Sequence, residues 1–593
     1  MEHAGVRSLT NQLAEDFAWL EEHARAQAKH VPLAAELHYA AALVRNVLAP
    51  YLEGHGPQPL HVAVVGGAGA GKSTVANMLC GAVLAESNPQ AGFTRHPVAY
   101  VPTGQVNWPS SLGYLGRLQR LDKVEPSSLD ADVYQIRRVS PEAGQFGVLE
   151  KFLVWDCPDM TTWAALGYVP RLLEVAALAD VIVYVASDER YNDEVPTQFL
   201  KLLLRSGKLV VVCLMKMRET DAPAFVEHFQ RAVLDQSLSR PVAIMTVPHL
   251  THAQLVDPNR NAPKFRVPIV NQIFVLGDSA TAARQRNVQA AMQYLASHQQ
   301  HLLSVARDDL IALEGWQQLV REGQLEFDNR YRREFLTTER FRRFDEALVR
   351  LLELLELPGI GRFVSKTMDV LRFPWTMTKK LFNTALARPD VSSMPEKQVL
   401  EDALAGWTDQ LRKEAARKAA THPLWRHVND GFNTGLADTI KSRFNESLKG
   451  FEISLNEEVD RTARAIYEDL EKKPVALNAF RGTKFGLEIA GIVASATAIF
   501  HGGVVCALLI PLSASVVQML VEFFGKQYVD FHREQTRDRQ QALVNAHVSA
   551  PLADWLTKWP TTGGSAHERL QRILHRLPEN VLKLHEAIAE VGK

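Results

Sequence analysis

A glycine-rich turn around residue 70 constrains the fold of this chain more than any other feature. Residues 61–74 read HVAVVGGAGAGKST, so an apolar run leads directly into Gly66-x-x-x-x-Gly71-Lys72-Ser73. In this Walker A pattern, backbone N–H groups cradle phosphates, the lysine reaches the β- and γ-phosphates, and the serine hydroxyl binds magnesium. The sequence therefore predicts a strand, a phosphate loop and a helix that bind a nucleoside triphosphate. The predicted nucleotide-binding residues of this turn are Gly66, Gly67, Ala68, Gly69, Ala70, Gly71, Lys72, Ser73 and Thr74.

Length and charge limit the remaining possibilities. A chain of 593 residues is too long for one hydrophobic core and should form several units. Its net charge of −1 provides no basic surface of the kind that binds DNA or RNA, so we expect no nucleic-acid partner. The four cysteines form no CxxC pair and are expected to be reduced thiols of a cytoplasmic protein. The first residues lack the basic start and apolar core of a signal peptide.

Hydrophobic periodicity divides the chain into five segments. Residues 1–58 predict N-terminal helices that pack with the stalk, and residues 59–278 contain six short β-branched runs. These runs, HVAVV, PVAYV, KFLVW, DVIVYVA, KLVVVCL and PVAIMTV, predict an α/β P-loop domain with a mainly parallel sheet. Residues 279–481 are charged and poor in glycine, which predicts an extended α-helical bundle stalk. Residues 482–526 are apolar, and residues 527–593 predict returning C-terminal helices.

The apolar segment 482–526 predicts a helical hairpin at the tip of the stalk. Its two arms, separated by His501-Gly502-Gly503, would be about 18 and 27 Å long, against about 30 Å for the hydrocarbon core of a membrane. These lengths favour a hairpin embedded in one leaflet over two spanning helices. The alternative is a pair of helices buried in the stalk or against another subunit. A second stretch, residues 357–382, is basic and aromatic, and we expect it to form a bend between helices rather than a lipid contact.

Two further positions match the needs of a nucleotide-dependent switch. Such a protein needs a threonine in a loop that meets magnesium and the γ-phosphate, and Thr94 lies in the string GFTRHPV after the phosphate loop. It also needs an aspartate at a strand end that holds magnesium through water, and Asp156 follows the apolar run FLVW. Each signal is weak alone, but their order after the Walker A pattern strengthens both.

These motifs carry a family resemblance. The residues from Gly66 to Thr74, the string Thr94-Arg95-His96-Pro97 and the string Asp156-x-Pro158-x-Met160-Thr161 together resemble the first three nucleotide motifs of the dynamin superfamily of large GTPases. The resemblance implies GTP as substrate, with Lys72, Ser73, Thr94 and Asp156 as the catalytic residues. It also implies a Mg²⁺ cofactor that is bound by Ser73, Thr94 and Asp156.

The order of the segments is similar to that of bacterial dynamin-like proteins and mitofusins. In those families the late apolar hairpin is a membrane paddle, and the nucleotide domains pair when nucleotide is bound. The resemblance therefore implies self-association through the nucleotide domains and lipid contact through residues 482–526.

The phosphate-binding motifs depart from the family pattern at three positions. Ala68 and Gly69 stand where the family usually has a polar residue and a serine that position water and neutralise charge, so a fast and a slow enzyme both remain open. Asp159 replaces a glycine whose N–H would meet the γ-phosphate. Its carboxylate can repel phosphate, orient water or face solvent, and we expect it to face solvent.

The base-binding motif also departs from the pattern. A guanine pocket normally has an Asn/Thr-Lys-x-Asp string, whereas this chain reads Leu214-Met215-Lys216-Met217-Arg218. Arg218 has no acceptor for the guanine N–H groups. Lys216 is left to stack on the base, with Glu219 or Asp221 as substitute acceptors, and ATP remains an alternative to GTP.

Taken together, the sequence predicts a dynamin-like GTPase that couples GTP binding and hydrolysis to self-assembly and to membrane binding or remodelling. We expect it at the inner face of the membrane, either peripheral or inserted through the hairpin. The alternative is a soluble nucleotide-dependent switch or scaffold, using GTP or ATP, whose hairpin is buried against protein.

Overall fold

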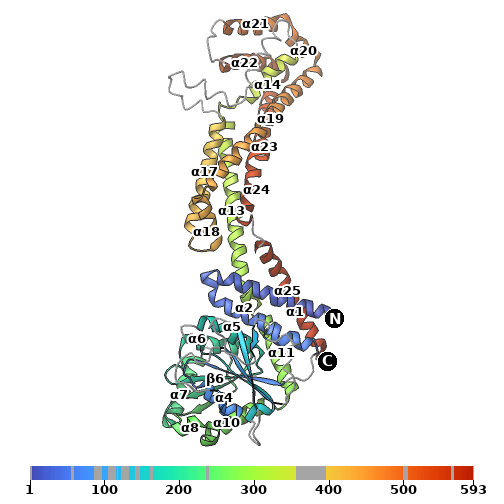
Figure 1. The fold of residues 1–593 in the computed structure, drawn as a ribbon. Helices are drawn as coiled ribbons and strands as arrows, with labels where there is room; N and C mark the ends of the chain where they lie inside the picture. The colour runs from blue at the N-terminus through green and yellow to red at the C-terminus, as the bar shows by residue number, and fades with distance from the viewer. Residues whose placement is uncertain are drawn as a thin grey trace. The chain divides into compact units, whose positions relative to one another are not determined.

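Two separately packed units make up the chain (Figure 1). Unit 1 consists of Met1–Asp308 and Ala566–Lys593, and unit 2 is Asp309–Ser565. The computed structural model describes residues 3–54, 59–85, 96–103, 115, 118–121, 132–139, 147–160, 165–235, 239–355, 396–497, 505–562 and 566–591.

Unit 1 is built on one eight-stranded sheet with the strand order β3-β4-β2-β5-β1-β6-β7-β8. The pairings are parallel except that β2 runs antiparallel to β5. The strands are β1 Leu60–Gly66, β2 Val98–Pro102, β3 Gln119–Leu121, β4 Val133–Val139, β5 Phe152–Asp156, β6 Val181–Ser187, β7 Leu209–Met215 and β8 Ala243–Val247. The predicted α/β domain with a mainly parallel sheet is confirmed.

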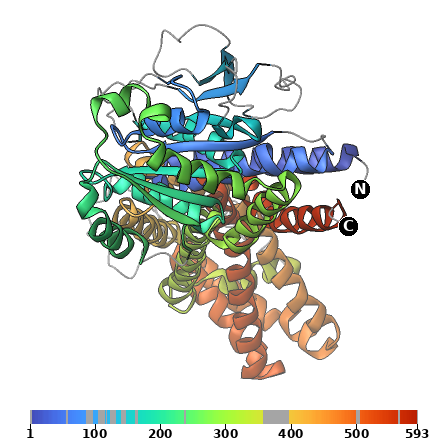
Figure 2. The ribbon, with the colours of Figure 1, turned by 90° about the horizontal axis from the view of Figure 1, so that it is seen from below.

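Helices cover both faces of this sheet. Alternate side chains of a strand point to opposite faces, so Ala63 and Val65 join a core with α1, α2, α5 and α25, whereas Val62 and Val64 join a core with α4 and α10. Figure 2 shows α1 beside α25. The helices of unit 1 are α1 His3–Arg25, α2 Val31–Leu43, α3 Ala49–Leu52, α4 Lys72–Cys80, α5 Ala165–Leu178, α6 Glu194–Arg205, α7 Ala222–Phe229, α8 His252–Val256, α9 Pro258–Asn261, α10 Pro263–Leu276, α11 Ala280–Ser297, α12 Gln299–Leu302 and α25 Ala566–Val591.

The described part of unit 2 is helical and has its own hydrophobic core. Helix α13, Ser304–Tyr331, begins in unit 1 and continues into unit 2, where the fully buried Trp316 donates a hydrogen bond of 2.8 Å from Nε1 to the carbonyl oxygen of Leu556. The other helices are α14 Arg343–Leu354, α17 Glu396–Lys418, α18 Pro423–Asn433, α19 Leu436–Glu471, α20 Pro474–Arg481, α21 Thr483–Thr497, α22 Val505–Phe524, α23 Lys526–Val544 and α24 Ala550–Lys558.

The limits of the two units differ from the predicted segments. The N-terminal helices belong to the unit that contains the sheet, because buried side chains of α2 such as Leu37 share a core with α5. The predicted segments 279–481 and 527–593 each divide between the two units, since α11 and α25 also lie in unit 1. All of the stretch 357–382 and residues 498–504 of the predicted hairpin lie outside the described residues.

Candidate functional site

The phosphate loop lies between β1 and α4, as the sequence predicts. Two of its glycines are required by close packing. A Cβ atom at Gly66 would lie 2.1 Å from the carbonyl oxygen of Val185, and one at Gly71 would lie 2.8 Å from Sδ of Met215. Gly71 also has a φ of 104°, a conformation that side chains disfavour. The backbone can therefore turn tightly enough to aim its N–H groups at a phosphate.

Lys72, the first residue of α4, lies inside this turn and is buried. Its Nζ atom donates to the carbonyl oxygen of Gly67 at 3.0 Å and forms an ion pair with the carboxylate of Asp159. The side chains of Lys72 and Asp159 are only 5% and 10% exposed. Our expectation that Asp159 faces solvent is therefore wrong. A buried carboxylate needs a charged or hydrogen-bonding partner, and the Lys72 ammonium is such a partner for Asp159.

Ser73 and Asp156 meet beside the lysine. Asp156 ends β5, which pairs with β1 so that Asp156 is in register with Val64. The hydroxyl of Ser73 donates to Oδ2 of Asp156 at 3.0 Å. The other oxygen, Oδ1, is buried and has no hydrogen-bond partner among the residues that the structure describes. Two of the three predicted metal ligands are thus brought together.

The electrostatics of Asp156 reflect this setting. Burial raises the pKa of its carboxyl to about 6, against the opposing effects of the Lys72 charge and the Ser73 hydrogen bond, while the nearby Asp159 raises it further. A buried, unsatisfied carboxylate oxygen next to a hydroxyl suits Mg²⁺, which prefers oxygen ligands and usually takes one or two from the protein and others from phosphates and water. The residues present therefore fit a magnesium ion.

The base-binding string lies against the phosphate loop. Met215 ends β7 and packs on Gly71, and the exposed side chain of Lys216 donates to the carbonyl oxygen of Gly69. Glu219 forms an exposed ion pair with Lys264. Lys216 thus lies beside the loop, whereas Glu219 already has a cationic partner.

Some predicted site residues cannot be placed. Thr94, Arg95 and Thr161 lie outside the described residues. The rest of the predicted set, from Gly66 to Thr74, forms the turn and the first residues of α4. Sequence reasoning missed the burial of Asp159, although one signal was present: residues 152–160 read FLVWDCPDM, a string in which Asp156 and Asp159 are the only charged residues.

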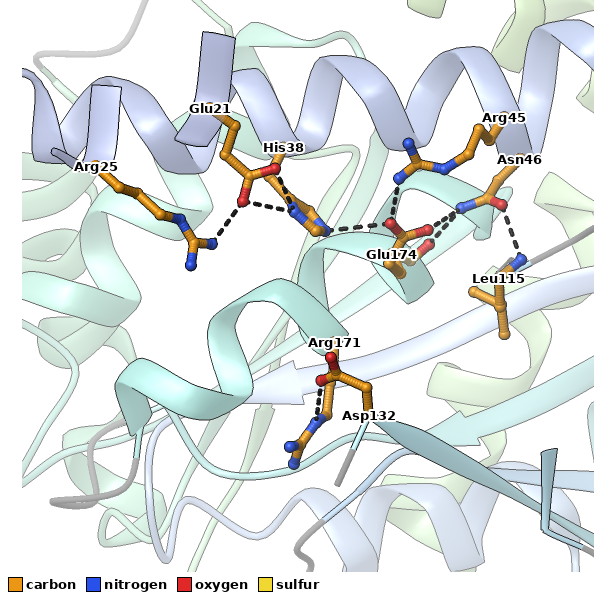
Figure 3. Close-up of polar contacts among 9 residues, drawn as sticks. All are labelled: Glu21, Arg25, His38, Arg45, Asn46, Leu115, Asp132, Arg171 and Glu174. Atoms are coloured by element: carbon orange, nitrogen blue, oxygen red, sulfur yellow. Dashed lines mark hydrogen bonds and ion pairs between the residues drawn. The ribbon is translucent and has the colours of Figure 1, made fainter. Parts of the chain in front are cut away.

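A second buried polar cluster was not predicted (Figure 3). His38 of α2 lies between two carboxylates, with Nδ1 3.0 Å from Glu21 of α1 and Nε2 3.2 Å from Glu174 of α5. Arg45 also pairs with Glu174, at 2.5 Å. Burial alone would lower the pKa of His38, but its hydrogen bonds to Glu174 and Glu21 outweigh burial and raise it. This cluster fixes the N-terminal helices to α5.

Asn46 extends the cluster toward Leu115, which follows β2 in the chain. Its Nδ2 donates to Oε2 of Glu174 at 2.8 Å, and its Oδ1 accepts from the backbone N–H of Leu115 at 2.9 Å. Leu115 is fully buried and has a φ of 55°, which is uncommon for a residue with a side chain. Glu174 therefore connects the N-terminal helices to the helix that follows the Asp156 motif in the chain.

Comparisons with known proteins bear on this site. Residues 61–216 match the family model described as 50S ribosome-binding GTPase. No curated protein is similar enough in sequence to match the chain.

Two solved structures are similar to this chain, and both are described as coming from an oligomerised bacterial dynamin pair that provides a mechanism for the long-range sensing and tethering of membranes. The first is 13% identical with a TM-score of 0.36, and the match covers 92% of this chain and 91% of that one. The second is 12% identical with a TM-score of 0.35, covering 94% and 92%.

The matched family residues begin one residue into β1 and end at Lys216, so they include the phosphate loop, Asp156 and Asp159. Residues 61–216 of this chain therefore form a GTPase domain.

Proposed function

We propose that this chain is a dynamin-like GTPase, which couples GTP binding and hydrolysis to self-association and to membrane binding. The observation that carries the nucleotide half is the 3.0 Å contact between Ser73 and Asp156, next to the buried Lys72. The order of the parts supports self-association and membrane binding, because a GTPase domain with N-terminal helices is followed by a long helical unit that contains the apolar helices α21 and α22.

In this proposal each residue has a defined task. Lys72 would bind the β- and γ-phosphates, and Ser73 and Asp156 would hold Mg²⁺, Asp156 through water. When bound, Mg²⁺ would neutralise charge on the phosphates. Thr94 contributes to metal binding and hydrolysis, as the family resemblance implies. Lys216 lies along the base, in keeping with its contact to Gly69. GTP is the proposed substrate.

A nucleotide-binding measurement tests the proposal that the phosphate loop binds GTP. Lys72→Ala should weaken the binding of GTP with Mg²⁺ by about 100-fold or more, since it removes the only charge that the loop offers to the phosphates. Lys151→Ala is the matched control, because Lys151 pairs with Asp278 at the surface of the same unit. Unchanged GTP binding by Lys72→Ala would refute the assignment. Parallel titrations with ATP decide the choice of base.

The membrane half rests on the apolar helices α21 and α22. Among the described residues, no helix is both long enough and apolar enough to cross a membrane. Leu487 of α21 and Ile510 of α22 are nevertheless 72% and 48% exposed. We therefore propose that these helices support a tip that enters one leaflet, so that the protein binds the membrane peripherally.

Liposome flotation tests the membrane half without deleting core residues. Leu487→Glu combined with Ile510→Glu should lower recovery with vesicles of phosphatidylcholine and phosphatidylglycerol, because charge is excluded from the acyl region. Leu325→Glu with Ile453→Glu is the matched control, since both residues are exposed on α13 and α19. Equal recovery of both variants and the unaltered protein would end this half of the proposal.

One observation favours a second function, a soluble nucleotide-dependent switch. The opposite faces of α21 and α22 are buried in the core of unit 2, through Phe485, Ile489, Leu512 and Val516. Ser515 of α22 also donates to Glu488 of α21 at 3.1 Å. A protein with intact GTP binding that stays out of the lipid fraction would support this function.

A further inference from the structure

We propose that Asp159 is a specificity-determining residue: its carboxylate pairs with the Lys72 ammonium and disfavours a triphosphate relative to a diphosphate. This inference rests on the proposed function, because it concerns the same phosphate site.

The first support is the position of the carboxylate. Lys72 has three N–H donors, and within the described residues they serve the carbonyl oxygen of Gly67 and the carboxylate of Asp159. Both are protein acceptors on a lysine whose expected ligands are the β- and γ-phosphates. The protein thus supplies an internal anion where the substrate would bring its own.

The second support is the confinement of the pair. Asp159 lies three residues after the strand-end Asp156, in a run where every residue from Phe152 to Met160 is buried. Asp156 and Asp159 interact electrostatically, so one lysine faces two carboxylates. Little water is available to screen an added negative charge there, and like charges in such a setting repel strongly.

A diphosphate and a triphosphate differ in the phosphate groups that they bring to Lys72 and Asp159. Both nucleotides carry the α- and β-phosphates, which the backbone N–H groups of a Walker A loop bind, and in both the β-phosphate also reaches Lys72. Only the triphosphate adds the γ-phosphate, a second phosphate that must share Lys72 with the Asp159 carboxylate or displace it. The penalty imposed by Asp159 is therefore larger for the triphosphate.

The test is calorimetric titration of the full chain with GDP and with a non-hydrolysable GTP analogue, both with Mg²⁺. Asp159→Asn keeps the shape of the side chain and removes the charge, so it should tighten the analogue about tenfold or more and change GDP affinity by less than about threefold. Asp159→Glu keeps the charge and should retain the original preference. Asp235→Asn is the surface control, because Asp235 pairs with the exposed Arg240 in the same unit.

Each outcome of this titration either supports or overturns the inference. A raised ratio of triphosphate to diphosphate affinity in Asp159→Asn alone supports the inference, and a purely structural role of Asp159 would not change that ratio. An unaltered ratio, with both nucleotides still bound, overturns the inference and leaves the proposed function intact. If the original protein and Asp159→Asn are folded by circular dichroism but bind neither nucleotide, the proposed function fails and the inference falls with it.

Discussion

Asp156 shows how one residue can serve a ligand at a cost to the free protein. Its carboxyl is buried, and one of its oxygens has no hydrogen-bond partner among the described residues. The native state therefore holds a proton on Asp156 more tightly than the unfolded chain does, with a pKa of about 6 against an ordinary value of 3.8. Because the native state binds this proton more tightly, the free energy of unfolding falls as the pH rises from about 4 to about 6. Above that range it stays at the lower value.

We accordingly predict that Asp156→Asn stabilises the nucleotide-free GTPase domain at pH 8 by about 2 kcal/mol and has little effect near pH 4. The measurement is the free energy of unfolding of unit 1 at the two pH values, without nucleotide. The same variant should need more Mg²⁺ for GTP binding, because a neutral amide is a poorer partner for the ion and its water. A variant that is less stable than the original at pH 8 would contradict this account.

At the scale of elements, the cluster around Glu174 ties α5 to the N-terminal helices (Figure 3). Burial would raise the pKa of Glu174, but the hydrogen bond from His38 and the charge of Arg45 outweigh burial and lower it to about 2. Its contribution to stability is therefore present above pH 4.5 and is lost as the pH falls toward 2. His38 has a raised pKa, so its contribution is complete below 6.5 and is lost as the pH rises through the raised value.

The cluster leads to a second prediction. Glu174→Gln should lower the free energy of unfolding of unit 1 by about 3 kcal/mol at pH 6, because it removes the carboxylate that pairs with Arg45 and one of the two carboxylates that pair with His38. It should also flatten the acid dependence below pH 4.5. The control is Glu227→Gln, whose exposed partner is Arg231, and little change is expected there. Equal loss of stability in the two variants would argue against the cluster.

Helix crossings in unit 2 provide a third prediction. Gly323 of α13 faces Trp407 of α17, and a Cβ atom at Gly323 would lie 2.0 Å from Cδ1 of the buried indole ring. Gly323→Ala gains about 1 kcal/mol of helix propensity, but overpacking costs more, so we expect a net loss of about 1 to 2 kcal/mol in thermal or denaturant unfolding. Gly450→Ala in α19 meets only an ordinary contact at 3.8 Å and should be neutral or stabilising.

Elements differ in how well the sequence predicts them. Six apolar runs predict β1, β2, β5, β6, β7 and β8, and all six are strands. The sequence does not predict β3 or β4. β3 is only three residues long, and Arg137 and Arg138 interrupt the apolar pattern of β4. A local pattern also does not predict packing between segments that are far apart in the chain. No periodicity in residues 1–58 indicates that they share a core with α5 and α25.

The residues of the candidate site also differ in how well the sequence predicts them. The Walker A spacing predicts the positions of Lys72 and Ser73, and a strand-end aspartate predicts Asp156. The ion pair between Lys72 and Asp159 was not predicted, because the family pattern has a glycine there and the sequence does not show which anion the lysine meets. When a residue such as Asp159 departs from the family pattern, its contacts can be found only in the three-dimensional structure.

At the scale of the whole molecule, the phosphate loop raises the question of what completes the catalytic site. Ala68 and Gly69 offer no polar side chain, so the loop contributes backbone N–H groups and Lys72 to the developing charge of the transition state. Preorganised donors of that kind are usually a large part of catalysis, and a missing cationic group can be supplied by a partner molecule. Self-association through the GTPase domains would provide such a partner.

We therefore predict that GTP turnover per molecule rises with protein concentration. Over a range from about 0.1 to 10 μM, we expect an increase of about tenfold or more if a second copy completes the site. Phosphate release at a series of concentrations measures it, with bovine albumin added to the dilute samples as a control for total protein. A turnover per molecule that stays constant and low, together with intact GTP binding, would identify a nucleotide-binding scaffold, because binding alone needs only Lys72, Ser73 and the phosphate loop.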